Sequence, residues 1–314
     1  MINILSTPSN NYTMPCGIMF YSACVNNKKG TIHFFIICDE SFQEENKKKL
    51  RDTVEPFGNK LDFIIIDDKY INNIVNLESS WYPKYVFYRI FMAELFPTDI
   101  HKMLYLDCDI IVRHSLDSLW NIDLTNYSLA CVPDSQEGTI EYYNRLEYPA
   151  EKGYFNAGVL LANLDYWREH QIGKKIKDFI ANQSQKIKFQ DQDILNYNLW
   201  DSKLYLPLTY NFQSGFLYKK RLMNFEYLKY KESLEEAKKD PIILHLSGVR
   251  PWIEKCPHPM KDEFYKYKAQ TIWKDEPLQK RPVFLMHRII NALRKPLSKY
   301  GVSVRENPYD YQSL

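Results

Sequence analysis

Two carboxylates, Asp107 and Asp109, are separated by a single residue inside the apolar segment LYLDCDIIV. A charged group in such a segment is unfavourable unless it is paired with another charge or bound to a metal ion. In an extended strand the two side chains would share one face, with their Cα atoms about 7 Å apart. Two hard oxygen ligands on one face suit a Mg²⁺ or Mn²⁺ ion that also holds a phosphate. The pair therefore predicts a metal site, the alternative being two carboxylates at a strand end, one of which caps the next turn.

Two further segments set polar side chains beside apolar runs. In YFNAGVL, Asn156 and Gly158 predict either a turn where an amide meets a ligand or an ordinary loop. The second segment, residues 190–193 (QDQD), precedes ILNYNLW and predicts either a ligand site or an acidic helix N-terminus. The helix alternative is reasonable because an Asp at that position complements the helix dipole.

A candidate third metal ligand, His245, lies in the short apolar run PIILHL, and Gly248 follows it. A His at a strand end next to a Gly can complete a carboxylate metal site, although a lone His is more often a core or surface residue. Arg250 comes next, and its guanidinium suits either a diphosphate or a surface ion pair. Glycine-rich phosphate loops, nucleophile elbows and zincin motifs are absent, which disfavours P-loop NTPases, dinucleotide enzymes, serine hydrolases and zincins.

These residues must be positioned by the surrounding elements, and the chain alternates apolar runs with amphipathic stretches. Apolar runs of this length are typical of strands buried on both faces, as in a parallel sheet. A capping box at residues 41–44 (SFQE) and an apolar face in residues 82–95 predict intervening helices. The alternation predicts an α/β domain with a mainly parallel sheet, which binds ligands at the carboxyl ends of its strands. The expected strands are 2–7, 32–38, 61–66, 103–112, 129–132 and 241–246.

Composition narrows the function classes. The 314 residues include 41 Lys+Arg and 39 Asp+Glu, so a nucleic-acid-coating protein is not expected. No apolar run approaches the roughly 18 residues of a transmembrane helix, and the first residues lack the pattern of a signal peptide. Six cysteines without a C-x-x-C pair predict reduced thiols in a cytoplasmic protein.

The near-neutral net charge of +2 conceals a basic C-terminal segment. Residues 280–299 contain six Lys or Arg and no Asp or Glu, so the rest of the chain sums to −4. Apolar residues recur at helical spacing in this segment, which fits an interfacial helix on an anionic bilayer. The alternative is a basic helix docked on the domain.

Taken together and in order, these segments resemble the family 8 retaining glycosyltransferases, and within them the bacterial enzymes that build lipopolysaccharide or lipooligosaccharide cores. The resemblance covers about residues 2–265 and is carried by SNNY, FYRIFMAELFP, KMLYLDCDIIV, YFNAGVLLANLDYW, FQDQDILN and HLSGVRPW. It implies a GT-A-type fold, with a catalytic domain at 1–265 and a helical, membrane-associating extension at 266–314. It also implies a UDP-galactose or UDP-glucose donor and a Mn²⁺ or Mg²⁺ ion.

The resemblance assigns roles to individual residues. Asp107, Asp109 and His245 would hold the metal, which neutralises charge on the departing UDP. Gln192 would face the anomeric carbon, either as a weak nucleophile or as an electrostatic stabiliser. The other implied positions are Thr7, Ser9, Asn11 and Arg89 at the uridine end, Gly248 and Arg250 at the diphosphate, Asn156, Ala157 and Asp191 at the donor sugar, Cys108 between the two metal ligands, and Asp134 and Gln190 toward the acceptor.

Three positions depart from the family pattern. Ser9 stands where the family usually has an acidic residue, so the uracil contact must differ. The segment HLSGVRPW is one residue short and carries Arg250 in place of the usual Lys, which changes the geometry of a phosphate contact. Cys108 replaces a commoner apolar residue and is expected to point to the face opposite the metal.

The resulting hypothesis is transfer of galactose or glucose to a glycolipid acceptor in an α linkage. The enzyme would lie in the cytoplasm, at the inner face of the cell membrane. Two alternatives come from other classes. A metal-dependent phosphohydrolase also uses a D-x-D strand, although usually its first one, and a binding or stress-related protein can share the fold without efficient transfer.

Overall fold

The computed structural model describes residues 1–67, 69, 74, 84–136, 140–217, 227–248 and 250–280. The predicted membrane-binding segment at 280–299 lies outside these residues except for Lys280. In the described part of the chain, no helix is both long enough and apolar enough to cross a bilayer.

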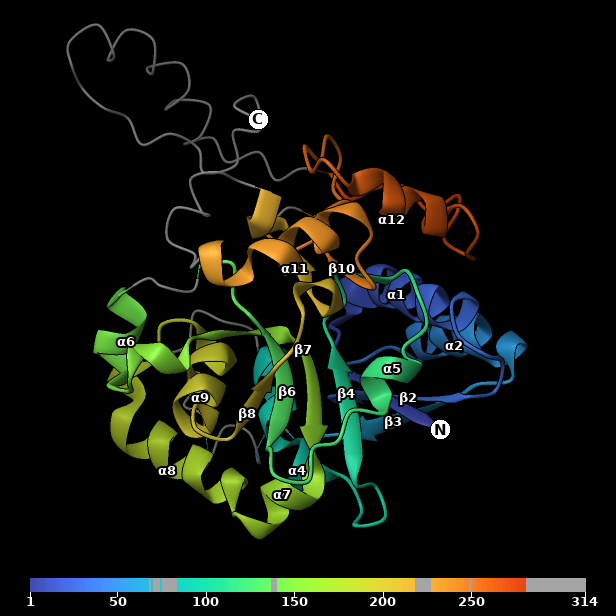
Figure 1. The fold of residues 1–314 in the computed structure, drawn as a ribbon. Coiled ribbons are helices and arrows are strands. Elements are labelled where there is room, and N and C mark those ends of the chain that lie inside the picture. The colour runs from blue at the N-terminus through green and yellow to red at the C-terminus, as the bar shows by residue number, and fades with distance from the viewer. Residues whose placement is uncertain are drawn as a thin grey trace, which may run out of the picture.

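A seven-stranded sheet forms the centre of the molecule, in the order β3-β2-β1-β4-β7-β6-β8 (Figure 1). Strands β3, β2, β1 and β4 are parallel, β7 runs antiparallel to both β4 and β6, and β8 is parallel to β6. The mainly parallel α/β sheet expected from the apolar runs is confirmed. The strands are β1 (Ile2–Ser6), β2 (Ile32–Cys38), β3 (Lys60–Ile65), β4 (Lys102–Leu106), β6 (Leu129–Pro133), β7 (Phe155–Asn163) and β8 (Lys203–Tyr205).

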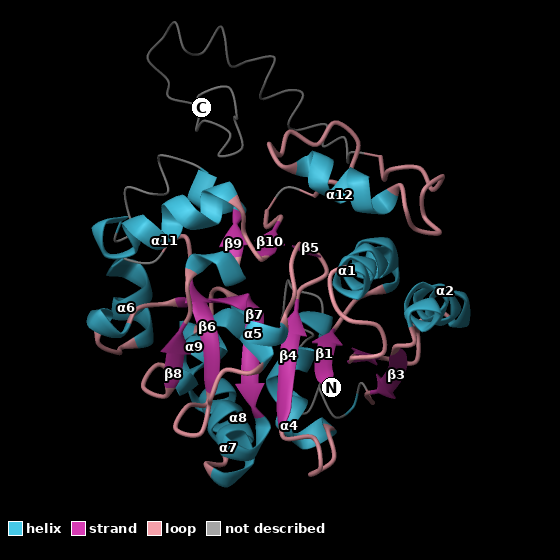
Figure 2. Cartoon of the chain, turned by 45° about the vertical axis from the view of Figure 1, so that its right-hand side comes forward, coloured by secondary structure: helices cyan, strands magenta, loops and turns pink. Residues whose placement is uncertain are grey.

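A second sheet of three short strands lies beyond the carboxyl end of β4 (Figure 2). It consists of β5 (Ile110–Val112), β10 (Ile243–His245) and β9 (Phe212–Gln213). The expectation of one strand over residues 103–112 was therefore wrong. The chain leaves the large sheet after Leu106 and enters the small one at Ile110, so the two carboxylates lie in the turn between the sheets.

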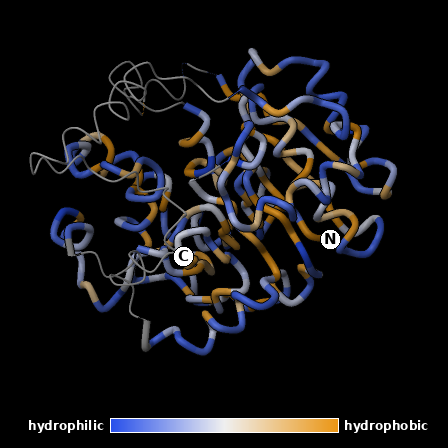
Figure 3. The backbone as a smooth tube through the Cα atoms, turned by 90° about the horizontal axis from the view of Figure 1, so that it is seen from above, coloured by the Kyte–Doolittle hydropathy of each residue, from blue (hydrophilic) through white to orange (hydrophobic). Residues whose placement is uncertain are grey.

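Two hydrophobic clusters cover the two faces of the large sheet. Alternate residues of β4 enter different clusters, with Leu104 and Leu106 on one side and Met103 and Tyr105 on the other. Helices α1 (Thr13–Val25) and α2 (Glu44–Val54) pack on the first face. The other face is covered by α7 (Leu164–Glu169), α8 (Ile172–Gln183) and α9 (Gln190–Leu199). Figure 3 shows hydrophobic residues gathered on the central strands and hydrophilic ones around the outside.

Local structure differs from the sequence-based expectations in three places. Helix α2 begins at Glu44 with Gln43 as its N-cap and no side-chain cap bond, because Ser41 instead hydrogen-bonds Asp39. The helix expected over 82–95 is a 3₁₀ helix (Lys84–Phe91) followed by the short α4 (Met92–Leu95). The predicted turn at 154–160 is strand β7, with a register shift opposite it in β6.

The segment that follows residue 265 packs against the preceding domain. Helix α12 (Lys261–Lys268) runs across the expected boundary at 265. After it, Trp273 is buried against Gly17 of α1, where a Cβ atom would lie 1.8 Å from the indole. Gln279 then pairs with Ile253 and donates from its side chain to the backbone oxygen of Asn11 at 3.1 Å. Among the described residues, the remaining α-helices are α5 (Asp117–Trp120), α6 (Ile140–Leu146) and α11 (Tyr227–Lys239).

Candidate functional site

Polar residues follow three neighbouring strands directly where each one ends. Thr7 comes after β1, Asp39 after β2 and Asp107 after β4. These strands are parallel and adjacent, so the three side chains lie along one edge of the sheet. This edge is where ligands bind in open α/β sheets, as the strand pattern predicted.

Asp107, Asp109 and His245 converge at this edge, and one ligand atom from each lies within 4.8 Å of the other two. His245 Nε2 is 3.2 Å from Asp109 Oδ1 and 3.9 Å from Asp107 Oδ2. Backbone hydrogen bonds hold the turn in place, from Asp107 N to Gly158 O and from Leu246 N to Asp109 O, both 2.9 Å. The predicted triad is therefore assembled, by a turn between two sheets rather than by one strand.

The three side chains suit a divalent cation. Burial lowers the pKa of His245, but Asp109 and then Asp107 outweigh it and raise that pKa above its usual value. Space beside them is kept open by Gly158, where a Cβ atom would lie 2.4 Å from His245 Cε1 and 2.8 Å from Asp107 Oδ2. Two carboxylates and an imidazole are ligands that Mn²⁺ accepts, and Mg²⁺ binds through such carboxylates.

Arg89 is buried between two carboxylates. Its Nη2 is 2.9 Å from Asp107 Oδ1, and its Nε is 3.2 Å from Asp191 Oδ2. Nη1 donates to Ala157 O at 2.9 Å, and the guanidinium lies 4.1 Å from the centre of the Tyr105 ring. Burial lowers the pKa of Arg89, but the carboxylates of Asp107 and Asp191 outweigh this effect and raise the pKa above its usual value. The side chain therefore stays charged. The resemblance groups Arg89 with the uridine end, whereas the structure places it between the metal ligands and Asp191.

Asp191 lies in the first turn of α9 and is also buried, so the helix N-terminus and the site coincide. Burial raises its pKa to about 6, although Arg89 opposes the shift. Asp191 Oδ2 and Arg89 Nε face each other as an ion pair at 3.2 Å, although their geometry falls short of a hydrogen bond. Both residues line a cavity, so this buried ion pair forms part of its wall.

That cavity is lined by the donor-sugar residues of the predicted site. Its walls comprise Val86, Arg89, Asp107, Asn156, Ala157, Gly158, Phe189, Gln190, Asp191 and Gln192. The neighbouring Asp193, by contrast, is fully buried and structural. It accepts from Arg145, from Tyr154 and from the backbone of Lys188 and Phe189.

An amide network connects β7 with α9 on one side of this cavity. Gln192 Oε1 accepts from Ala157 N at 3.0 Å and from Asn156 Nδ2 at 3.3 Å. Asp134 Oδ2 accepts from Asn156 Nδ2 at 3.1 Å and from Gln192 Nε2 at 3.3 Å. Asp134, expected toward the acceptor, therefore hydrogen-bonds two amides that line this cavity. Gln190 lines the same cavity at the start of α9.

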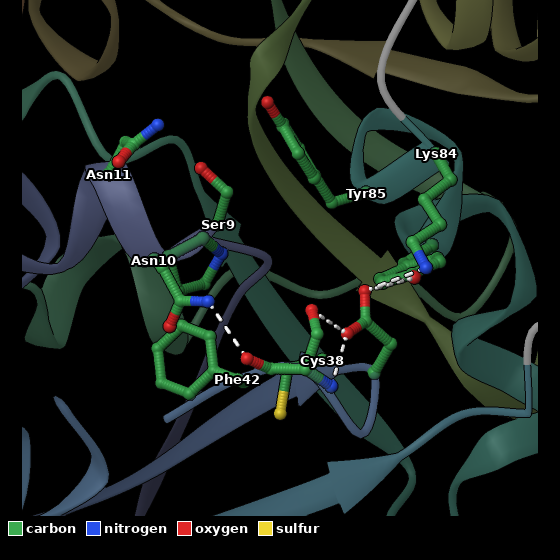
Figure 4. A pocket seen from close by; sticks show the side chains of 11 residues that line it. Ser9, Asn10, Asn11, Cys38, Phe42, Lys84 and Tyr85 are labelled. Carbon is green, nitrogen blue, oxygen red and sulfur yellow. Dashed lines mark hydrogen bonds and ion pairs between the residues drawn. The ribbon is translucent and has the colours of Figure 1, made fainter. Parts of the chain in front are cut away.

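A second cavity lies between the loops that follow β1 and β2 (Figure 4). Ser9 and Asn11 line it, while Thr7 lies deeper and hydrogen-bonds the Tyr105 hydroxyl at 3.2 Å. Lys84 crosses to Asp39 and forms an ion pair with Oδ2 at 3.0 Å. Burial raises the pKa of Asp39, but hydrogen bonds from Ser41 and Lys84 outweigh this effect and lower the pKa below its usual value.

The last predicted residues lie on the turn after β10. Gly248 has a φ of 89°, in the region that favours glycine, and Arg250 lies 5.4 Å from the centre of the Tyr12 ring. Tyr12 in turn meets Trp252 edge to face, with ring centres 5.4 Å apart. Cys108 Sγ lies 3.4 Å from the Ser6 hydroxyl on β1.

Several residues that the structure brings to the site were not predicted from the sequence. Asp39 had a usable signal, because it follows an apolar run as Asp107 does. Lys84 and Asn211 had none, because each reaches its partners across a long stretch of chain. Asn211 donates to Asn156 Oδ1 and contacts His245 Nδ1, both at 2.9 Å.

Comparison with known proteins places this geometry in context. The sequence model of glycosyl transferase family 8 matches residues 3–256. General stress protein A of Bacillus subtilis is 30% identical over 278 residues, covering 87% of this chain and 95% of that protein. A lipopolysaccharide 1,3-galactosyltransferase of Salmonella typhimurium is 24% identical, covering 86% and 79% of the two chains.

Solved structures share the fold. The galactosyltransferase LgtC, in complex with donor and acceptor sugar analogues, superposes with a TM-score of 0.74 at 23% identity. The match covers 86% of this chain and 96% of that one. The chain thus has the GT-A fold that the resemblance implied.

Proposed function

Because this chain belongs to glycosyl transferase family 8, as its match over residues 3–256 establishes, we propose that it transfers galactose or glucose from a UDP-sugar. The acceptor is a lipopolysaccharide or lipooligosaccharide core, and the product carries an α linkage. Relatives named as lipopolysaccharide galactosyl- and glucosyltransferases support this choice of acceptor. Membership of the family argues against the phosphohydrolase alternative.

One observation carries the proposal: the metal-ligand triad and the sugar-facing residues are joined through a single guanidinium. Arg89 contacts Asp107 of the triad and Asp191 beside the donor cavity. Glycosyl transfer needs a stabilised leaving group next to a held sugar, and this arrangement sets the two requirements side by side. The intact triad and the cavity also argue against a purely non-catalytic protein.

The leaving-group side is built from acidic and basic residues together. A divalent cation held by Asp107, Asp109 and His245 would supply the charge that neutralises the departing UDP. Arg250, on the turn after β10, would add positive charge at the diphosphate. Ser9 and Asn11 line the cavity at the nucleoside end, where Ser9 offers a hydroxyl in place of the usual carboxylate.

The sugar side is built from Asp191 and the amides. Asp191 lines the cavity beside the amides, where its carboxylate would accept hydrogen bonds from sugar hydroxyls. Gln192 would lie at the anomeric carbon, with Oε1 engaged by two N–H groups. Those hydrogen bonds withdraw electron density from the oxygen and favour electrostatic stabilisation over nucleophilic attack. Gln190 and Asp134 would contribute to the acceptor side.

Release of UDP tests the proposal directly. The protein is incubated with Mn²⁺ or Mg²⁺ and a panel of UDP-sugars, with and without lipooligosaccharide acceptors. Metal-dependent UDP release that rises with acceptor and is fastest for UDP-galactose or UDP-glucose supports it. Failure of every nucleotide-sugar to turn over would sink it.

We also propose that residues 280–299 bind the enzyme to the anionic inner face of the cell membrane. The six basic residues and the apolar helical spacing of this segment support the proposal. Removing residues 281–314 is expected to abolish binding to phosphatidylglycerol vesicles while preserving turnover of a soluble acceptor. A matched variant carrying Arg288→Gln, Arg294→Gln and Lys295→Gln should bind the vesicles more weakly, and its binding should depend less on salt. Unchanged vesicle binding by the truncated protein would refute the assignment.

A further inference from the structure

Asn211 lies outside the predicted site yet hydrogen-bonds both halves of it. It is fully buried and immediately precedes β9, which pairs in parallel with β10 with Gln213 opposite His245, so the Asn211 side chain reaches the imidazole. One end of its amide is 2.9 Å from Asn156 Oδ1, and the other is 2.9 Å from His245 Nδ1. The side chain therefore joins the small sheet to strand β7 of the large one.

The direction of this hydrogen-bond chain is fixed at its Asn156 end. The backbone N–H of Gly158 donates to one terminal atom of the Asn156 amide at 3.0 Å, so that atom must be the oxygen. The other terminal atom faces the Asp134 carboxylate at 3.1 Å, so it must be the nitrogen. The Gly158 N–H can only donate and the Asp134 carboxylate can only accept, so these two groups orient the Asn156 amide independently of the metal site.

The same logic carries through Asn211 to the imidazole. The group of Asn211 that faces Asn156 Oδ1 must donate, so it is Nδ2, and Oδ1 is left to face His245 Nδ1. A carbonyl oxygen only accepts, so Nδ1 carries a proton. The second ring nitrogen, Nε2, then points at Asp109 Oδ1, 3.2 Å away.

We propose that Asn211 is a positioning residue that holds the His245 imidazole with Nε2 toward the metal and couples the metal site to the donor-sugar amides. Partners of this kind orient metal-binding histidines and are worth about 10- to 100-fold in metal affinity. The coupling to the sugar side rests on the proposed function, whereas the effect on metal binding does not.

The test measures Mn²⁺ affinity by isothermal titration calorimetry on the full chain without nucleotide. Asn211→Leu keeps the approximate volume but removes both hydrogen bonds, and we expect it to bind Mn²⁺ about 10- to 100-fold more weakly. Asn211→Asp keeps an acceptor for Nδ1, so its Mn²⁺ affinity should stay close to that of the wild type. If the Leu variant does not fold, Asn211→Ala takes its place with the same expectation.

A matched control separates positioning from general destabilisation. Asn59 is a second buried amide, accepting from Ile32 N at 3.1 Å and donating to Cys24 Sγ at 3.2 Å, away from the site. Asn59→Leu should lower stability and leave Mn²⁺ affinity unchanged. Wild-type affinity in a folded Leu or Ala variant, or weak binding by Asn211→Asp, overturns the proposal. Because no donor is present, this result is independent of whether the enzyme transfers sugar.

Discussion

Gly158 lies so close to His245 that a Cβ atom at residue 158 would be 2.4 Å from the imidazole Cε1. The same atom would be 2.8 Å from Asp107 Oδ2. Neither neighbour can withdraw easily, because the imidazole is buried and hydrogen-bonded to Asn211, and Asp107 is bonded to Arg89 and Tyr105. The triad can therefore assemble only because residue 158 of β7 has no side chain.

Gly158→Ala should fold and yet bind Mn²⁺ at least about tenfold more weakly, because the methyl group must displace a ligand. Calorimetric titration with Mn²⁺ measures the change, and near-ultraviolet circular dichroism checks the fold. Gly173→Ala is the matched control. Its Cβ would also collide, at 2.2 Å, but with the end of the flexible Glu94 side chain, so its metal affinity should not change. Equal affinities for the two variants would contradict the role of Gly158.

Arg89 should be as important for stability as for the site. Replacing it with Met removes the positive charge from between Asp107 and Asp191 and leaves buried negative charge without compensation. Losing one partner of a buried pair costs about 3 kcal/mol or more, and urea denaturation should show a loss of this size. In an Asp191→Asn background the same change should cost at least about 1 kcal/mol less. Strictly additive losses would show that the two side chains are not coupled.

Stability should fall on mild acidification through His258. Burial lowers the pKa of this imidazole from 6.5 to about 4. Between these values the unfolded chain takes up a proton that the folded protein excludes, so unfolding becomes easier as pH falls, by up to about 1.4 kcal/mol per pH unit. Asp191, whose pKa is raised to about 6, acts in the opposite direction over the same window. His258→Gln isolates the histidine contribution because Asp191 is present in both proteins.

The measurement is urea denaturation of both proteins at several values between pH 4 and pH 7. The wild-type free energy of unfolding should rise more steeply with pH than that of His258→Gln. In the folded protein His258 is hydrogen-bonded to the Ser214 hydroxyl at 2.6 Å and accepts from Met260 N at 3.0 Å. Parallel pH profiles would mean that burial does not lower the pKa of His258.

Much of the fold and of the site was accessible from the sequence because burial on both faces leaves a clear pattern. Strands β1, β2, β3 and β6 appear as continuous apolar runs, and the residues after such runs reach one edge of a parallel sheet. That reasoning brings Asp107, Asp109 and His245 to the site, and the resemblance assigns roles to Asn156 and Gln192.

What the sequence concealed depends on contacts between distant segments. The run from 103 to 112 is equally apolar whether it forms one strand or crosses between two sheets, so the turn at Asp107–Asp109 left no signal. Ser41 had the right spacing for a capping box, but its hydroxyl donates to the Asp39 carboxylate instead. Asn211 looks like any polar residue in a loop until the pairing of β9 with β10 sets it against His245.

Metal-dependent transfer from a UDP-sugar is tested most directly by comparing the wild type with Asp109→Asn in Mn²⁺-dependent release of UDP. Each protein is given UDP-galactose or UDP-glucose, with and without a lipooligosaccharide acceptor, and circular dichroism confirms that both are folded. We expect the wild type to release UDP only with the metal, and faster when the acceptor is present. The variant should release UDP at least about a hundredfold more slowly. Metal-independent release, or wild-type activity in Asp109→Asn, would contradict metal-dependent transfer.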